Sequence, residues 1–267
     1  MDRRLELVED AFGGTVVMLD GHAQSYVQLA DPELLAFEYT QFLGAVVDAL
    51  ADGPLAVTHV GGAGLTLPRY VAVTRPGSPQ IVLEPDAELT DVVRAALPLP
   101  RGHRIRIRPQ DGRTGLHALA DASADLVIVD AFAGGQVPAE LTTVEWFTDV
   151  ARVLRPGGVV AINLADEPAR RHLARVHAGL VELLPHTGAM STPEVRKGRR
   201  FGNTVLVASA EDLPLGPLAR NIAKAAFSAS FEHGSALRRY LGSARPFHDD
   251  DAQPSPPPPT ADAWRVR

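Results

Sequence analysis

A glycine-rich segment between two apolar runs constrains the fold of this chain more than any other feature. Residues 61–64 read Gly-Gly-Ala-Gly after the strand-like run 57–60, and a second apolar run at 81–83 ends in Glu84. Glycines let the backbone turn sharply near a ligand, and a carboxylate at the tip of the next strand can accept hydrogen bonds from both ribose hydroxyls. A tight turn without a ligand is the alternative, but the acid at this distance favours a nucleoside site.

The spacing of the glycines distinguishes between two kinds of nucleoside-binding site. A dinucleotide fold normally shows G-x-G-x-x-G, whereas the sixth position here is Leu67, followed by Pro68. The third glycine, which allows close helix packing, is therefore missing. We expect an adenosyl sulfonium ligand, S-adenosylmethionine or a relative, in preference to NAD.

Composition narrows the class of protein further. The chain has 267 residues, of which 45% are hydrophobic, so it can bury a core of ordinary stability. Its net charge of -6 argues against nucleic acid as a partner, and the absence of cysteine excludes thiolate zinc sites and a cysteine nucleophile. There is no signal-peptide core or long apolar run, and no histidine–acid spacing of a zinc or iron site. We expect a cytoplasmic protein with no membrane segment and no metal.

Periodicity predicts a β-hairpin, a helix and then alternating strands and helices. Asp20-Gly21 joins two strand-like runs within residues 14–29, and Asp31-Pro32 is typical of a helix start, with apolar residues at helical spacing up to Leu50. The strands expected after it are 56–60, 80–83, 105–108, 126–129, 159–163, 181–184 and 204–208, the last two antiparallel. This is the α/β fold of a class I methyltransferase, a Rossmann-like sheet of seven strands preceded by a small N-terminal β-hairpin.

Three units follow from this pattern. Residues 1–50 form the N-terminal hairpin and helix, and residues 51–245 form the methyltransferase-like domain. Residues 246–267 contain an aspartate run and four consecutive prolines. Such a segment can bury too little apolar surface to offset the conformational entropy lost on ordering, so we expect a disordered tail.

Three further polar positions bear on chemistry. Asp111, before Gly112, follows the third strand and could accept the exocyclic amine of adenine, although an Asp-Gly turn is the alternative. Asp130 ends a buried strand, where α/β sheets present reacting groups, or else it caps a nearby turn. Gln24 could reach the glycine loop from the hairpin, or lie exposed on its strand.

The order of these segments resembles a known family, the polyamine aminopropyltransferases typified by spermidine synthase. Members are similar in having L-D-G-x-x-Q-S in an N-terminal β-domain, a G-G-G-x-G loop, an acid after the second strand, a D-A or D-G pair, and V-D followed by P-x-x-L. The corresponding residues here are 19–25, 61–64, Glu84, Asp111-Gly112, and Asp130 with 138–141. The resemblance spans roughly residues 14–210.

The resemblance implies transfer of an aminopropyl group from decarboxylated S-adenosylmethionine to a small amine. Asp130 would be the catalytic base, Glu84 would hold the ribose and Asp111 the adenine amine. Gln24 would contact the adenosyl ligand. The cofactor-binding loops would be those of Gly61, Gly62 and Gly64 and of Gly112. The resemblance also implies a homodimer.

Several residues depart from the family pattern. Ala133 stands where a second aspartate is usual, Tyr39-Thr40-Gln41 replaces Y-H-E or Y-H-D, and Leu65 replaces an acid that would meet the donor's amino group. A diamine such as putrescine needs a carboxylate at each end, so we expect a retained adenosyl pocket and a diverged acceptor pocket. An S-adenosylmethionine-dependent methyltransferase of a small molecule or protein, and a non-catalytic family member, remain open alternatives.

Overall fold

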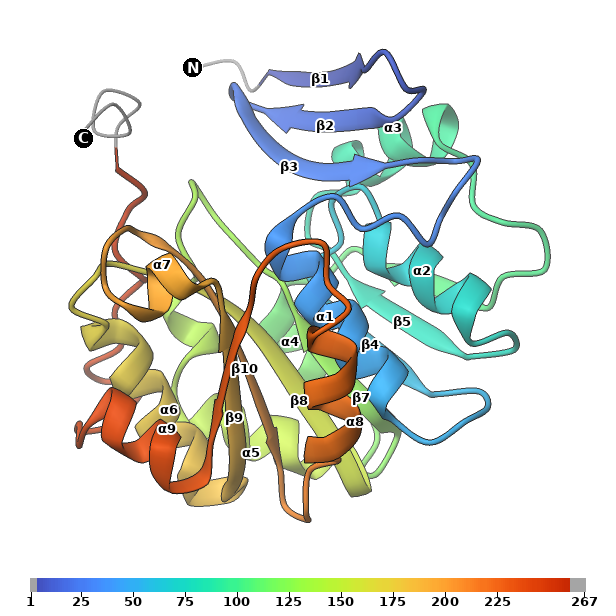
Figure 1. Ribbon diagram of the computed structural model, residues 1–267. Helices are drawn as coiled ribbons and strands as arrows, with labels where there is room; N and C mark the ends of the chain where they lie inside the picture. Colours follow the sequence, from blue (N-terminus) through green and yellow to red (C-terminus); the bar gives the residue numbers. More distant parts are fainter. Residues whose placement is uncertain (1–3, 260–267) are drawn as a thin grey trace.

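The structure, a computed structural model, describes residues 4–259 and contains two β-sheets (Figure 1). The larger sheet has eight strands in the order β11-β9-β10-β8-β7-β4-β5-β6, and its strands from β8 to β6 run parallel. The smaller sheet has the order β1-β2-β3 and is antiparallel. The strands are β1 (Leu5–Glu9), β2 (Thr15–Leu19), β3 (His22–Val27), β4 (Val57–Val60), β5 (Gln80–Leu83), β6 (Ile105–Arg108), β7 (Ala124–Val129), β8 (Leu154–Asp166), β9 (His186–Ser191), β10 (Gly202–Ser209) and β11 (Ser230–His233).

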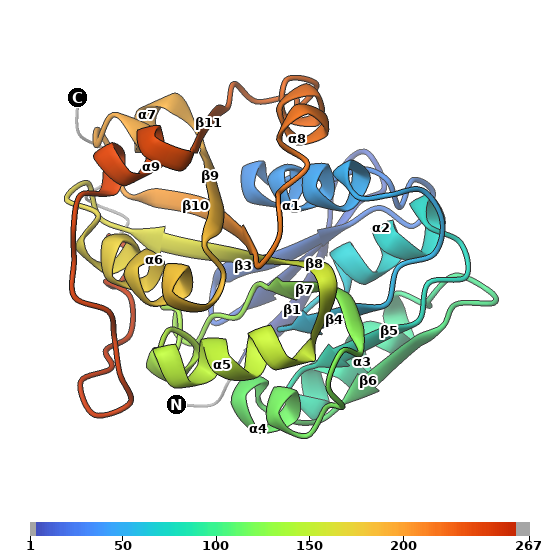
Figure 2. The ribbon, with the colours of Figure 1, turned by 90° about the horizontal axis from the view of Figure 1, so that it is seen from below.

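Helices cover both faces of the larger sheet (Figure 2). They are α1 (Glu38–Ala49), α2 (Thr66–Thr74), α3 (Ala87–Ala96), α4 (Gly112–His117), α5 (Val144–Val153), α6 (Arg171–Leu183), α7 (Pro193–Arg196), α8 (Leu215–Ile222) and α9 (Gly234–Leu241), with a short 3-10 turn, η1 (Ala139–Leu141). In β7, Leu126 and Ile128 pack on the α1, α2 and α8 side, whereas Val127 and Val129 pack on the α4, α5 and α6 side. From Leu126 to Val129 the strand is apolar because both of its faces are buried. No helix within residues 4–259 is long and apolar enough to span a bilayer.

The expected sheet of methyltransferase type is confirmed, with an antiparallel pair after the parallel strands and one additional edge strand, β11. The hairpin at Asp20-Gly21 is also confirmed, and both turn residues have positive φ. It is part of a three-stranded sheet, because residues 5–9 pair with β2. The sequence pattern missed that edge strand.

Two expected elements differ in the structure. The helix expected from Pro32 begins at Glu38, because Asp31 caps only a single turn: its side chain accepts from the Glu33 amide and its carbonyl from the Leu34 amide. The strand expected at 181–184 is wrong. These residues end α6, whose buried residues recur at helical spacing from Leu173 to Leu180, and the strand follows as β9.

The expected disorder of residues 246–267 is wrong for residues 246–259, while residues 260–267 lie outside the described part of the chain. Phe247 is 3% exposed, and the Arg175 guanidinium lies 3.7 Å from the centre of its ring. Asp249 accepts a hydrogen bond from Arg113 at 2.8 Å. The composition of the segment did not indicate this packing, because it depends on one buried aromatic side chain and a few ion pairs. The unit boundaries at residues 50 and 245 stay predictions.

The packing of Phe247 predicts a measurable loss of stability. Phe247→Ala should lower the free energy of unfolding by about 3 kcal/mol, because it empties a buried aromatic site. Urea denaturation measures the change. Phe12→Ala is the control, since Phe12 is 86% exposed and its loss should change stability by no more than about 0.5 kcal/mol. Equal effects of the two substitutions would contradict this packing.

Candidate active site

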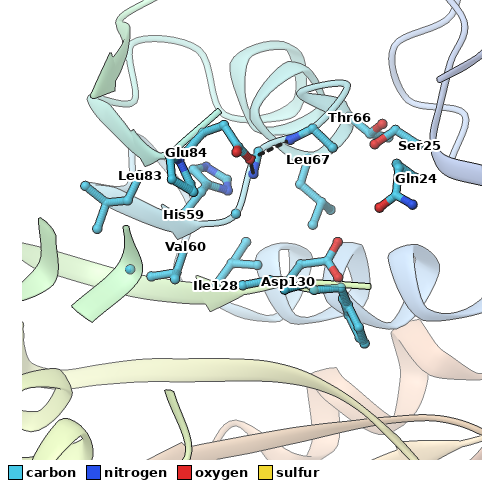
Figure 3. A pocket seen from close by; sticks show the side chains of 18 of the residues that line it. Gln24, Ser25, His59, Val60, Thr66, Leu67, Leu83, Glu84, Ile128 and Asp130 are labelled. Carbon is cyan, nitrogen blue, oxygen red and sulfur yellow. Dashed lines mark hydrogen bonds between the residues drawn. The ribbon is translucent and has the colours of Figure 1, made fainter. Parts of the chain in front are cut away.

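A pocket lies at the carboxyl ends of β4, β5, β6 and β7, beneath the small N-terminal sheet (Figure 3). It is lined by most of the expected site residues: Gln24, Gly61, Gly62, Glu84, Asp111, Gly112 and Asp130. Because these strands are parallel and adjacent, their ends bring residues far apart in the sequence to one edge of the sheet. The structure therefore assembles the predicted residues in one hollow.

Glu84 is in direct contact with the glycine loop. Its Oε2 accepts hydrogen bonds from the amides of Gly62 at 2.9 Å and Ala63 at 3.1 Å, and its Oε1 accepts one from the Asp86 amide at 3.0 Å. The side chain is nearly buried, at 9% exposed. A carboxylate has about four acceptor positions, so these three bonds leave about one for a ribose hydroxyl.

The glycines of the loop make room for the protein's own segments. At Gly61, which has a φ of +89°, a Cβ atom would lie 2.2 Å from the Asp130 carbonyl oxygen. At Gly62 it would lie 2.8 Å from Val82 Cγ1. Any larger residue would push the loop away from the ends of β5 and β7, so these glycines are required by packing before any ligand binds.

Gly64 lies behind the pocket wall and does not line it. Its amide donates to Ser25 Oγ at 3.0 Å, and a Cβ atom here would lie 2.6 Å from Ser25 Cβ. Thr66 Oγ1 also donates to the Tyr26 carbonyl oxygen at 2.9 Å. Gly64 thus docks the hairpin on the loop, and this docking brings Gln24 to the pocket. Its expected contact with a ligand stays a prediction.

Asp111 caps a helix and also lines the pocket, while its contact with adenine stays a prediction. Its Oδ1 accepts a hydrogen bond from the Thr114 amide at 2.8 Å and so caps α4. That hydrogen bond is the main reason why the pKa of Asp111 is lowered. The residue is exposed and also lines the pocket. At Gly112, a Cβ atom would lie 2.3 Å from Val60 Cγ1, so this glycine permits close packing of α4 on β4.

Asp130 lies at the end of β7 and points into the hollow (Figure 3). Its Oδ1 accepts a hydrogen bond from Asn163 Nδ2 at 2.9 Å, and the Tyr39 hydroxyl also bonds its carboxylate. Burial raises the pKa of Asp130 to about 6, while the hydrogen bonds from Asn163 and Tyr39 act in the opposite direction. A carboxylate with a pKa of about 6 can accept a proton more readily than an ordinary aspartate and is still ionised near pH 7.

Sequence reasoning did not assign a role to Tyr39 or Asn163. Burial, and then the nearby Asp130 charge, raise the pKa of Tyr39 well above its usual value, so it stays a hydroxyl donor. Asn163 is 1% exposed and lies within β8, beside β7. The sequence did contain a signal for Asn163. It is a polar residue that directly follows the apolar run 159–162 in an expected strand.

The departures from the family pattern have different structural consequences. Leu65 is 1% exposed and packs in the core with Val17 and Val82, so its side chain does not line the pocket. Gln41 donates to the Leu35 carbonyl oxygen at 2.7 Å and thus supports the start of α1. Ala133 does line the pocket. Thr40, in the place of the family's histidine, lines the pocket as well, so Ala133 and Thr40 are the departures that change the pocket wall directly.

The pocket is electrostatically negative. The carboxylates of Glu84, Asp111, Asp130 and Glu140 line it, and no lysine or arginine of residues 4–259 does so. His59 also lines it, but burial lowers its pKa to about 4, so the ring is neutral near pH 7. Such a site favours a cationic ligand.

Comparison with known proteins identifies the family. No protein-family model matches the chain. The crystal structure of a probable spermidine synthase from Corynebacterium glutamicum is similar, with a TM-score of 0.86 and 30% sequence identity over 93% of this chain and 94% of that one. The chain belongs to the spermidine synthase-like family.

Two further proteins are similar to this chain in part of the sequence or in fold. A polyamine aminopropyltransferase of Chromobacterium violaceum is 28% identical over 141 residues, which are 52% of this chain and 53% of that protein. The chain therefore matches this curated relative over about half of its length. A spermidine synthase in complex with the transition state analogue AdoDATO shares the fold, with a TM-score of 0.62 at 17% identity over 91% of this chain and 86% of that one.

The contact between Asn163 and Asp130 leads to a prediction about acidity. Asn163→Leu should raise the pKa of Asp130 further above about 6, because it removes a donor that stabilises the carboxylate. Carbon-13 NMR of the aspartate side chains over a pH series measures this value. Asn221→Ala on α8 is the control and should leave it unchanged. An unaltered titration in the Leu variant would show that Asn163 does not stabilise the charged form.

Proposed function

We propose that this chain transfers an aminopropyl group from decarboxylated S-adenosylmethionine to a small amine. The observation that carries the proposal is a partly buried carboxylate, Asp130, in a negatively charged pocket at the carboxyl edge of the sheet. Membership of the spermidine synthase-like family supports the same chemistry.

The adenosine part of the donor is assigned to the glycine loop and its neighbours. Glu84 would hold the ribose hydroxyls and Asp111 the exocyclic amine of adenine, since both carboxylates line one pocket from adjacent strand ends. The loop of Gly61 and Gly62 would lie along the ligand, and Gln24 would contact it from the hairpin. These are hydrogen-bond acceptors matched to nucleoside donors.

The charge of the pocket favours the decarboxylated donor. S-adenosylmethionine carries a carboxylate that needs a cation or free amides, whereas no basic side chain within residues 4–259 lines this pocket. The decarboxylated form carries only the sulfonium and an ammonium group. Both charges are attracted by the carboxylates of the wall.

The transfer is a nucleophilic displacement at carbon. A protonated amine has no lone pair, so Asp130 would first accept a proton from the acceptor ammonium. The amine nitrogen then attacks the carbon attached to sulfur, a new N–C bond forms, and the C–S bond breaks. Sulfur keeps the electron pair and leaves as methylthioadenosine. Tyr39 and Asn163 would hold Asp130 in line with the reacting atoms.

The other parts of the proposal concern the acceptor and the assembly. Ala133 on the pocket wall, in place of an aspartate, supports an acceptor site that has diverged from one for putrescine. The homodimer and the cytoplasmic location stay predictions.

The proposed base can be tested by substitution and pH. Asp130→Asn should lower kcat by about a hundredfold to ten-thousandfold, as expected for loss of a general base. In the wild type, kcat/KM should rise with pH through about 6, because Asp130 is a base only when it is unprotonated. Release of methylthioadenosine from decarboxylated S-adenosylmethionine, with a panel of primary amines, measures both.

Asp91→Asn is the matched control, since Asp91 is exposed on α3 and away from the pocket, and its activity should equal that of the wild type. Formation of S-adenosylhomocysteine from S-adenosylmethionine, without methylthioadenosine from the decarboxylated donor, would identify a methyltransferase instead. No turnover of either donor, despite nucleoside binding, would indicate a non-catalytic protein.

A further inference from the structure

The strand order separates the two ends of the pocket. Asp111 follows β6 and Asp130 follows β7, and β4 and β5 lie between those strands. With about 4.8 Å between neighbouring strands, the ends of β6 and β7 are about 14 Å apart along the sheet edge. Asp111 lies between these ends, because the adjacent Gly112 packs on Val60 at the tip of β4. The main chain of Glu140 lies near the Asp111 end, because its carbonyl oxygen accepts a hydrogen bond from Arg113 at 3.3 Å. The nucleoside assigned above occupies that end, so the acceptor must lie at the Asp130 end.

The Asp130 end has one carboxylate and an otherwise uncharged lining. Phe37 and Tyr39 are stacked there, with ring centres 6.0 Å apart, and Tyr39 contacts Asp130. Phe132 and Ala133 follow Asp130 along the chain and line the same pocket. Thr40 lines the pocket beside Tyr39, but its hydroxyl donates to the Phe37 carbonyl oxygen. The surface beyond the carboxylate therefore consists of aromatic rings, a methyl group and one neutral hydroxyl.

Neighbouring acids within the described residues are engaged elsewhere. Glu38, at the start of α1, accepts a hydrogen bond from Arg200 at 3.0 Å and does not line the pocket. Asp166, at the end of β8, accepts from the amides of Glu167 and Leu173, both at 2.7 Å. Neither acid is placed to receive a second ammonium group of an acceptor bound at Asp130.

We propose that the acceptor is a primary monoamine with an apolar carbon chain, and that a diamine is disfavoured. This inference rests on the proposed function and specifies its substrate class. The single ammonium of a monoamine pairs with Asp130, and its carbon chain packs against Phe37 and Phe132. A second ammonium would have to leave water against these rings without a carboxylate, which is unfavourable.

The matched amines butylamine and putrescine, which differ by one ammonium group, test the proposal with the full chain. With decarboxylated S-adenosylmethionine as donor, kcat/KM should be at least about tenfold higher for butylamine. Titration calorimetry of each amine, with the protein saturated with methylthioadenosine, should give the same order of affinity. Ala133→Asp should shift both ratios toward putrescine by about tenfold or more, because it supplies the second carboxylate.

Ala133→Asn controls for side-chain size without charge and should keep the preference of the wild type. A wild-type preference for putrescine, or no response of the ratio to Ala133→Asp, would overturn the inference. Failure of both amines to bind would overturn it as well. Failure of the proposed function gives a different result, because no methylthioadenosine is then formed with any amine. In that case the order of the two amine affinities, measured by calorimetry, still tests the inference.

Discussion

The hydrogen bonds between Glu84 and the glycine loop are the interaction on which the site depends. One nearly buried carboxylate oxygen accepts from two successive amides, those of Gly62 and Ala63, and so ties the tip of β5 to the loop after β4. Hydrogen bonds to a charged acceptor contribute about 1.5–3 kcal/mol each. The fixed loop presents the Gly64 amide to Ser25, which docks the N-terminal sheet over the pocket.

The second constraint is the burial of Asp130. Removal of this carboxylate from water raises its pKa, and the donors Asn163 and Tyr39 partly offset that cost without supplying a positive charge. An arginine in the same place would hold the group ionised and weaken it as a base. Neutral donors orient the carboxylate and leave it able to accept a proton. Within the described residues, no basic side chain lines the pocket, so the site is suited to a cation.

Residue spacing in the sequence predicted those features whose residues lie close together along the chain. The distance from the glycine loop to Glu84, and the turn at Asp20-Gly21, are encoded within about twenty residues and are present in the structure. Contacts between distant segments were not predictable in the same way. Asn163 reaches Asp130 across 33 positions, and Phe247 packs against Arg175 of helix α6 across more than 70 positions. Composition alone could not reveal that the proline-rich segment after it is held on the domain.

The central claim is that the adenosine part of a sulfonium donor binds between the glycine loop and Glu84. A crystal structure of the protein with methylthioadenosine at saturating concentration tests it most directly. The account predicts ribose hydroxyls within hydrogen-bond distance of the Glu84 carboxylate and the adenine amine near Asp111. A nucleoside bound elsewhere, or an empty hollow beside Glu84 under these conditions, would contradict it.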